Sequence, residues 1–145
     1  MRLVLDTDVL VAALRSDRGA SRQLLLCALD RDIEVLVSVP LMLEYEAVLT
    51  RPEHLDASGL TAEQVNEVLD ALANVLIPVH MSFRWRPRLK DPGDEMVLET
   101  AVNGEAGRLV TFNVRHLAAA AREFGIRVFR PRDMWKEVQR RNEEK

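Results

Sequence analysis

Arg2-Leu3-Val4-Leu5-Asp6-Thr7-Asp8 opens the chain with an apolar run that ends in two acidic residues. The run at 3–5 is typical of a strand buried on both faces, and a helix is expected over about 7–14. Ligands of open α/β sheets bind at the carboxyl ends of the strands, so Asp6 stands where a functional acid is expected. An N-cap for the following helix is the alternative. Asp8 is expected in the first turn of that helix or as a support for Asp6.

Strand-like and helix-like segments alternate along the chain, which predicts an α/β domain with a mainly parallel central sheet flanked by helices. Further strands are expected at 33–37, 77–81, 108–111 and 127–129. Helices are expected at about 21–29, 38–49 (stopped near Pro52), 61–76, 91–103 and 115–124. Thr61 and Gln64 form a capping box for the helix at 61–76. A terminal helix begins at Pro131 and is expected to fray into the polar tail RRNEEK.

Composition limits the class of protein and its partners. The chain has 145 residues, 48% of them apolar and 30% charged, which excludes a wholly disordered protein. A net charge of −3 argues against indiscriminate nucleic-acid binding, so any such binding needs a local basic patch. The lone cysteine, Cys27, is expected to be a buried thiol in a reducing compartment. No signal peptide or membrane span is visible, and we expect a cytoplasmic protein.

The helix at 38–49 carries two glutamates that helical geometry separates. Leu41, Tyr45 and Val48 define its apolar stripe, and Glu44 falls on the same face. Glu46 lies about 200° further round and is expected to face solvent. A buried glutamate is unfavourable without a partner, so metal binding or catalysis is the favoured role of Glu44 and an internal salt bridge the alternative.

The segment Asp91-Pro92-Gly93-Asp94 begins another helix. Asp91 suits the N-cap and Pro92 the first helical position, which assigns Asp91 mainly to capping. Asp94 precedes Val97, Leu98 and Ala101 by three, four and seven residues, which places it on the buried face. Asp94 is therefore assigned mainly to a functional site.

Asn113 follows the strand at 108–111, again at a carboxyl end. Its amide offers one oxygen and no charge, and turn formation would also explain an Asn here. Carboxylates brought together in this way repel one another unless a cation lies between them. The simplest chemistry that needs such a cluster is hydrolysis of a phosphodiester by a divalent metal ion.

Basic residues lie directly before the acidic helix. Residues 83–90 carry four cations and two aromatics, a combination suited to single-stranded nucleic acid. The alternative is a solvated connection with Trp85 in the core or at a dimer interface. Next to Asn113, His116 is either a general acid or an ordinary surface histidine. The candidate nucleic-acid contacts are Arg84, Trp85, Arg86, Arg88, Arg115 and His116.

Four segments in this order resemble the PIN domain, a family of metal-dependent nucleases. They are Leu-Asp-Thr-Asp-Val-Leu at 5–10, Glu44 in its helix, Asp94 seven residues before Ala101, and Thr-Phe-Asn at 111–113. The resemblance runs from Leu3 to about Met134. The segments WRPRLKDPGDEMVLETAVNG and LVTFNVRHL resemble the VapC-like toxins of bacterial toxin–antitoxin systems in particular.

The resemblance implies an endoribonuclease that uses Mg²⁺ or Mn²⁺, is usually dimeric and is inhibited by a cognate antitoxin. Residues 1–135 would form the PIN-like domain, and 136–145 the end of the last helix and a polar tail. The fourth acidic position of the family falls on Asn113, which argues against a stable second metal. The choice of RNA over DNA rests on the resemblance alone. The implied catalytic residues are Asp6, Glu44, Asp94 and Asn113, with Asp6, Glu44 and Asp94 at the metal and support from Asp8, Asp91 and Thr111.

Two other classes of function stay open at this point. Without an acid at position 113, the domain could bind RNA or a partner protein and not cut. The Asp-x-Asp at 6–8 also resembles the opening of haloacid-dehalogenase-like phosphatases, but Val9 and Leu10 depart from their pattern and the chain is short for that fold. The cations Lys136, Arg140 and Arg141 suit a solvated helix face or an antitoxin contact.

Overall fold

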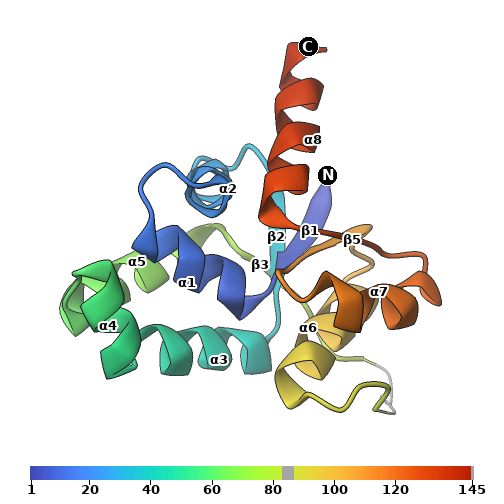
Figure 1. Ribbon diagram of the computed structural model, residues 1–145. Coiled ribbons are helices and arrows are strands. Elements are labelled where there is room, and N and C mark those ends of the chain that lie inside the picture. Colours follow the sequence, from blue (N-terminus) through green and yellow to red (C-terminus); the bar gives the residue numbers. More distant parts are fainter. Residues whose placement is uncertain (83–86, 145) are drawn as a thin grey trace.

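One parallel sheet forms the centre of the computed structural model, which describes residues 1–82 and 87–144 (Figure 1). In that part of the chain the strand order is β3-β2-β1-β4-β5, and every neighbouring pair is parallel. The expected parallel sheet is confirmed, although β3 is shorter than predicted. The strands are β1 (Arg2–Leu5), β2 (Glu34–Val37), β3 (Ile77–Pro78), β4 (Arg108–Val110) and β5 (Arg127–Phe129).

The strand order reverses at β1. The chain builds outward from β1 through β2 to β3, and then returns to place β4 and β5 on the other side of β1. Leu5 pairs with Val110, and the Asp6 amide donates to the Val110 carbonyl at 2.9 Å. The residues that follow β1 and β4 are therefore neighbours. In open α/β sheets such a reversal is where ligands bind.

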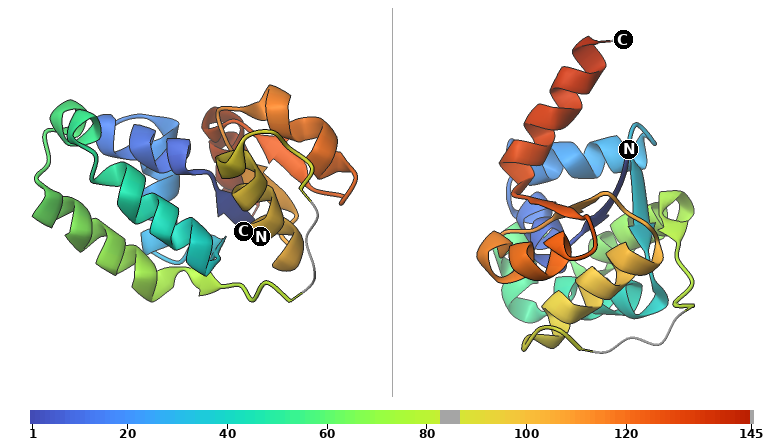
Figure 2. Two further views of the ribbon diagram at one scale, coloured as in Figure 1. Left: turned by 90° about the horizontal axis from the view of Figure 1, so that it is seen from below. Right: turned by 90° about the vertical axis from the view of Figure 1, so that its right-hand side faces the viewer.

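Helices cover both sides of the sheet, with α1 to α5 on one side and α6 and α7 on the other (Figures 1 and 2). Most helices begin and end within two residues of their predicted bounds. They are α1 (Thr7–Arg15), α2 (Ala20–Leu29), α3 (Val39–Leu49), α4 (Pro52–Ser58), α5 (Ala62–Val75), α6 (Pro92–Asn103), α7 (Val114–Arg122) and α8 (Pro131–Glu143).

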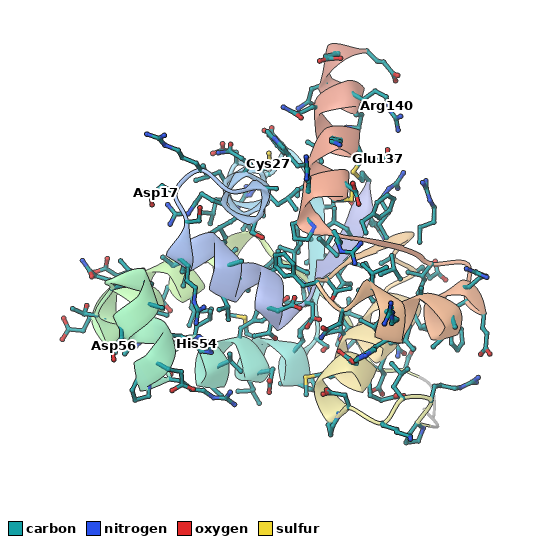
Figure 3. All side chains as sticks on the ribbon, in the orientation of Figure 1. Asp17, Cys27, His54, Asp56, Glu137 and Arg140 are labelled. Atoms are coloured by element: carbon teal, nitrogen blue, oxygen red, sulfur yellow. The ribbon has the colours of Figure 1, made fainter. Side chains whose placement is uncertain are left out.

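One helix was not predicted, and one prediction about a helix end was wrong. α3 ends at Leu49, just before Pro52 as predicted, but Pro52 is also the first residue of the unpredicted short helix α4, where proline has no amide to leave unpaired. The polar tail was expected to fray, but α8 continues to Glu143 and extends beyond the body of the molecule (Figure 1). An ion pair between Glu137 and Arg140 at 2.8 Å supports this end of α8 (Figure 3).

Other local predictions are confirmed. Thr61 and Gln64 form both hydrogen bonds of the capping box at the start of α5. Cys27 is a buried free thiol on α2 (Figure 3). Within residues 1–82 and 87–144, no helix has the length and apolar character needed to cross a membrane.

Candidate active site

Asp6 occupies the carboxyl end of β1 and is the N-cap of α1, which confirms the capping alternative and leaves its role as a functional acid a prediction. Only 7% of the residue is exposed. One carboxylate oxygen, Oδ1, accepts the Thr7 amide at 2.8 Å. The other, Oδ2, accepts the Thr111 hydroxyl at 2.7 Å. Asp6 is therefore held rigidly at the point where the strand order reverses.

Thr111 connects Asp6 to the turn after β4. The residue is fully buried, and its hydroxyl oxygen also accepts the Asn113 amide at 2.9 Å. One hydroxyl thus positions the Asp6 carboxylate and shapes the turn that carries Asn113. The sequence named Thr111 as a support, and the geometry provides that contact.

Asp8 lies in the first turn of α1, as predicted. Its Oδ2 accepts the Phe112 amide at 3.2 Å. Its Oδ1 is buried and makes no hydrogen bond within the described residues. A buried carboxylate oxygen without a partner is unfavourable, and it is the kind of atom that a cation would satisfy.

Burial and mutual repulsion raise the pKa of both aspartates. The pKa of Asp6 rises to about 7, chiefly through desolvation and then through the charge of Asp8. The pKa of Asp8 rises to about 6, again chiefly through desolvation, and the charge of Asp94 adds to it. The three carboxylates therefore sense one another's charge at one edge of the sheet.

Asp94 reaches this edge from the first turn of α6, on the other side of the sheet, and is 5% exposed. Asp91 is the N-cap of α6, as predicted, and its side chain accepts the amides of Gly93 and Asp94. Burial and the Asp91 charge raise the pKa of Asp94, while a hydrogen bond from the Asn113 side chain and the nearby His116 lower it. The His116 Nδ1 lies 4.0 Å from Asp94 Oδ2.

A profile of the PIN domain family matches residues 2–115. This chain belongs to the PIN domain family. Its fold is similar to that of a chain in the crystal structure of VapBC2 from Rickettsia felis bound to a DNA fragment from their promoter. That similarity has a TM-score of 0.60 at 16% identity and covers 88% of this chain and 97% of that chain. None of the curated proteins matches the sequence.

Glu44 is less closely tied to the site of this PIN domain than the aspartates. It is half-buried on α3, while Leu41, Tyr45 and Val48 are buried and Glu46 is exposed, as the helical pattern predicts. Among the described residues it has no hydrogen bond or ion pair. The acidic neighbours that raise the pKa of Asp6 are Asp8 and Asp94. The contact that holds α3 against β1 is made by the next residue, because the Tyr45 hydroxyl donates to the Leu5 carbonyl at 2.5 Å.

The donor set suits a hard divalent cation, because it consists of carboxylate oxygens and one amide oxygen. Across residues 1–82 and 87–144, however, no three His, Cys, Asp or Glu side chains are already arranged to enclose a metal ion. Two observations fit a metal nonetheless. The Asp8 Oδ1 has no partner, and the pKa values of Asp6, Asp8 and Asp94 are all raised in the way that a bound cation would relieve.

The predicted basic contacts divide into three groups. Arg84, Trp85 and Arg86 lie outside the described residues. Arg88 is occupied, because it donates to Glu123 at 2.9 Å and stacks on the Phe124 ring. Arg115 and His116 are exposed in the first turn of α7.

A cavity of about 440 Å³ lies at Asp94, and it is lined by Arg88, Leu89, Lys90, Asp91, Asp94 and His116.

The structure adds two residues that the candidate list from the sequence lacked. Lys90 lines the cavity beside Asp94 and is exposed. Phe112 is 46% exposed, and its amide holds Asp8. The position of Phe112 between Thr111 and Asn113 could have identified it from the sequence. A large apolar residue that comes after the end of a buried strand lies outside the core.

Proposed function

We propose that this PIN domain is a metal-dependent endoribonuclease, and that it acts as the toxin of a toxin–antitoxin pair. PIN domains are generally nucleases. The observation that carries the proposal for this chain is the acidic cluster at the reversal of the sheet. Burial raises the pKa of Asp6, Asp8 and Asp94, the charges of Asp8 and Asp94 add to the rise at Asp6, and the charge of Asp94 adds to the rise at Asp8. Such repulsion is unfavourable for stability, and proteins retain it where a cation or a reaction requires it.

Asp6 and Asp94 are proposed to hold Mg²⁺ or Mn²⁺, with Glu44 on α3 binding the ion or orienting a water. A bound ion would lower the pKa of a coordinated water and offset the negative charge of the phosphate. Thr111 keeps the Asp6 carboxylate in one orientation through its hydroxyl. Asp91 fixes the start of α6 and so the position of Asp94. Asn113 hydrogen-bonds Asp94 and adds no charge, which favours one metal over two.

The cavity at Asp94 is the proposed binding site for the RNA backbone. Lys90 and His116 line it and are exposed, so both can reach phosphate oxygens. Arg115 follows Val114 in the first turn of α7 and lies on the same edge of the sheet. Arg84, Trp85 and Arg86, which lie outside the described residues, are proposed on the sequence alone to contact RNA. Because the chain carries a net charge of −3, this local arrangement would have to supply the attraction for RNA.

The proposed partners of this protein are inferred from the similarity of its fold to the VapBC2 chain. The similar chain belongs to a VapBC2 structure, which supports a cognate antitoxin as the partner of this protein. A homodimer in the cytoplasm is the expected assembly. Residues 1–135 are assigned to the nuclease, and the exposed cations of α8, Lys136 and Arg140, are a candidate antitoxin contact.

One other function has a specific observation in its favour. Asn113 replaces an acid, and the described carboxylates do not already enclose a metal. A PIN domain that binds RNA or a partner protein without cutting would have the same two features. Metal binding separates the two functions, because the inert module has no need for Mn²⁺ at Asp6 and Asp94.

Cleavage of a mixed pool of structured RNAs with Mg²⁺ or Mn²⁺ tests the proposal. We expect cutting that EDTA stops and that Asp6→Ala abolishes. Asp56→Ala is the matched control, because Asp56 is exposed on α4 (Figure 3) and should cut normally. If folded, metal-loaded protein leaves every RNA intact, the nuclease is wrong and the inert module takes its place.

A further inference from the structure

Phe112 forms part of a second cavity, which the acidic cluster does not use. The cavity measures about 450 Å³ and lies between the end of α1, the start of α2, the turn after β4 and the start of α8. Its walls are mainly apolar, with Ala12, Ala20 and Pro131 beside the Phe112 ring. Phe112 is the aromatic residue among the four large apolar side chains that are exposed in the described part of the chain.

The backbone of Phe112 connects the lining of this cavity to the candidate active site. The Phe112 amide donates to Asp8 Oδ2 at 3.2 Å, and the preceding Thr111 hydroxyl donates to Asp6 Oδ2. The residue whose ring lines the cavity therefore holds one of the aspartates of the acidic cluster through its main chain. A nucleotide carries its base and its phosphate on one sugar, so it can fill both places at once.

Two polar groups in the cavity suit the rest of a nucleotide. Ser21 is 5% exposed and lines the cavity, and its hydroxyl makes no hydrogen bond within the described residues. This hydroxyl is not among the buried unpaired atoms of the described residues, so it is accessible at the cavity wall and can hydrogen-bond the polar edge of a base. Arg132 is exposed at the rim and has no ion pair to a described residue, in contrast to Arg88. It is available for a phosphate or a ribose.

We propose that the Phe112 cavity binds a nucleobase of single-stranded RNA, namely the base next to the phosphodiester that is cut, stacked on the Phe112 ring. The proposal rests on the proposed nuclease function for the identity of the ligand. Stacking on an aromatic ring tolerates every base because each has a flat face. The Ser21 hydroxyl can donate or accept, so it selects weakly among the bases. A base that stacks on the ring must leave its own helix, so the cavity favours single-stranded over paired RNA.

Binding without cutting gives the first test. Fluorescence anisotropy would measure the affinity of the protein for a labelled single-stranded RNA hexamer of mixed sequence. To prevent cutting, the measurement would use Asp94→Asn protein in Mg²⁺ and, separately, unsubstituted protein in EDTA. We expect Phe112→Ala to weaken binding about 5- to 100-fold, the usual effect of losing one stacked base. Phe112→Leu should lose nearly as much, because it keeps apolar bulk without a flat face, and Phe112→Tyr should bind normally. Leu26→Ala is the matched control, since Leu26 is 45% exposed and lies outside the cavity.

An abasic nucleotide scanned along the hexamer gives the second test. At one position it should weaken binding by the same factor, and Phe112→Ala should then have no further effect, because the same contact is already lost. Parental affinity in Phe112→Ala or in Phe112→Leu would overturn the proposal, as would a protein that binds no single-stranded RNA. These outcomes do not depend on cleavage. RNA bound through Phe112 but never cut would refute only the nuclease, and normal cutting with no role for Phe112 would refute only the cavity.

Discussion

The Thr111 hydroxyl donates to Asp6 Oδ2 across 2.7 Å, although the two residues lie 105 positions apart in the chain. The contact exists because β1 and β4 are neighbours at the point where the strand order reverses. It joins the end of one strand to the end of the other. Replacing Thr111 therefore changes the site without removing an acid.

Thr111→Val keeps the shape of the side chain and removes the hydroxyl. Asp6 Oδ2 and the Asn113 amide each lose a hydrogen bond. Leaving buried polar groups unpaired costs about 1–3 kcal/mol, so the free energy of unfolding in urea should fall by that amount. Cleavage should fall with it, while Thr111→Ser should restore both. Equal stability of the Val and Thr proteins would show that the hydroxyl supports nothing.

The raised pKa values predict how stability depends on pH in the absence of metal. The ordinary pKa of an aspartate is 3.8, whereas in the folded protein the pKa of Asp6 is about 7 and that of Asp8 is about 6. Between about pH 4 and 7 the folded state therefore holds more protons than the unfolded state, and stability falls as the pH rises. In EDTA, the Tm should be lower at pH 8 than at pH 5.

Asp6→Asn is the control for this pH dependence. It removes the buried charge and keeps an acceptor for Thr111, so the loss of stability toward pH 8 should shrink. If the Tm of the unsubstituted protein instead climbs steadily from pH 5 to pH 8, the carboxylates are not held close together in the folded state.

A divalent ion should reverse the same effect. Titrating Mn²⁺ at pH 8 should raise the Tm, and saturation at about 100 times the Kd corresponds to about 2.7 kcal/mol of added stability. The increase should be smaller at pH 5, where protons compete for Asp6 and Asp8. Asp94→Asn should remove most of it, and Asp56→Ala none. An equal increase in the Asp94→Asn protein would place the ion elsewhere.

The sequence predicted the parts of the site that follow from local patterns. Asp91 and Asp94 could be told apart because one residue suited a cap and the other the buried face of a helix. The cap and the burial are confirmed, and the role of Asp94 in the site stays a prediction. The sheet followed from alternating elements. The helix α4 was missed because a proline that cannot continue one helix is equally suited to begin the next. The cavity around Phe112 could not be predicted, because four separate segments of the chain form its walls.

Glu44 is the predicted site residue with the least support from neighbouring contacts, and α3 offers an internal control for it. Glu44 has no hydrogen bond or ion pair among the described residues, so Glu44→Gln should leave the free energy of unfolding unchanged. If Glu44 binds the ion or orients a water, the same substitution should reduce cleavage by at least about 100-fold. Glu46→Gln makes the same chemical change on the exposed face of α3 and should cut normally. Full activity of Glu44→Gln would restrict the metal site to the three aspartates at the carboxyl edge of the sheet, with Asp8 in place of Glu44.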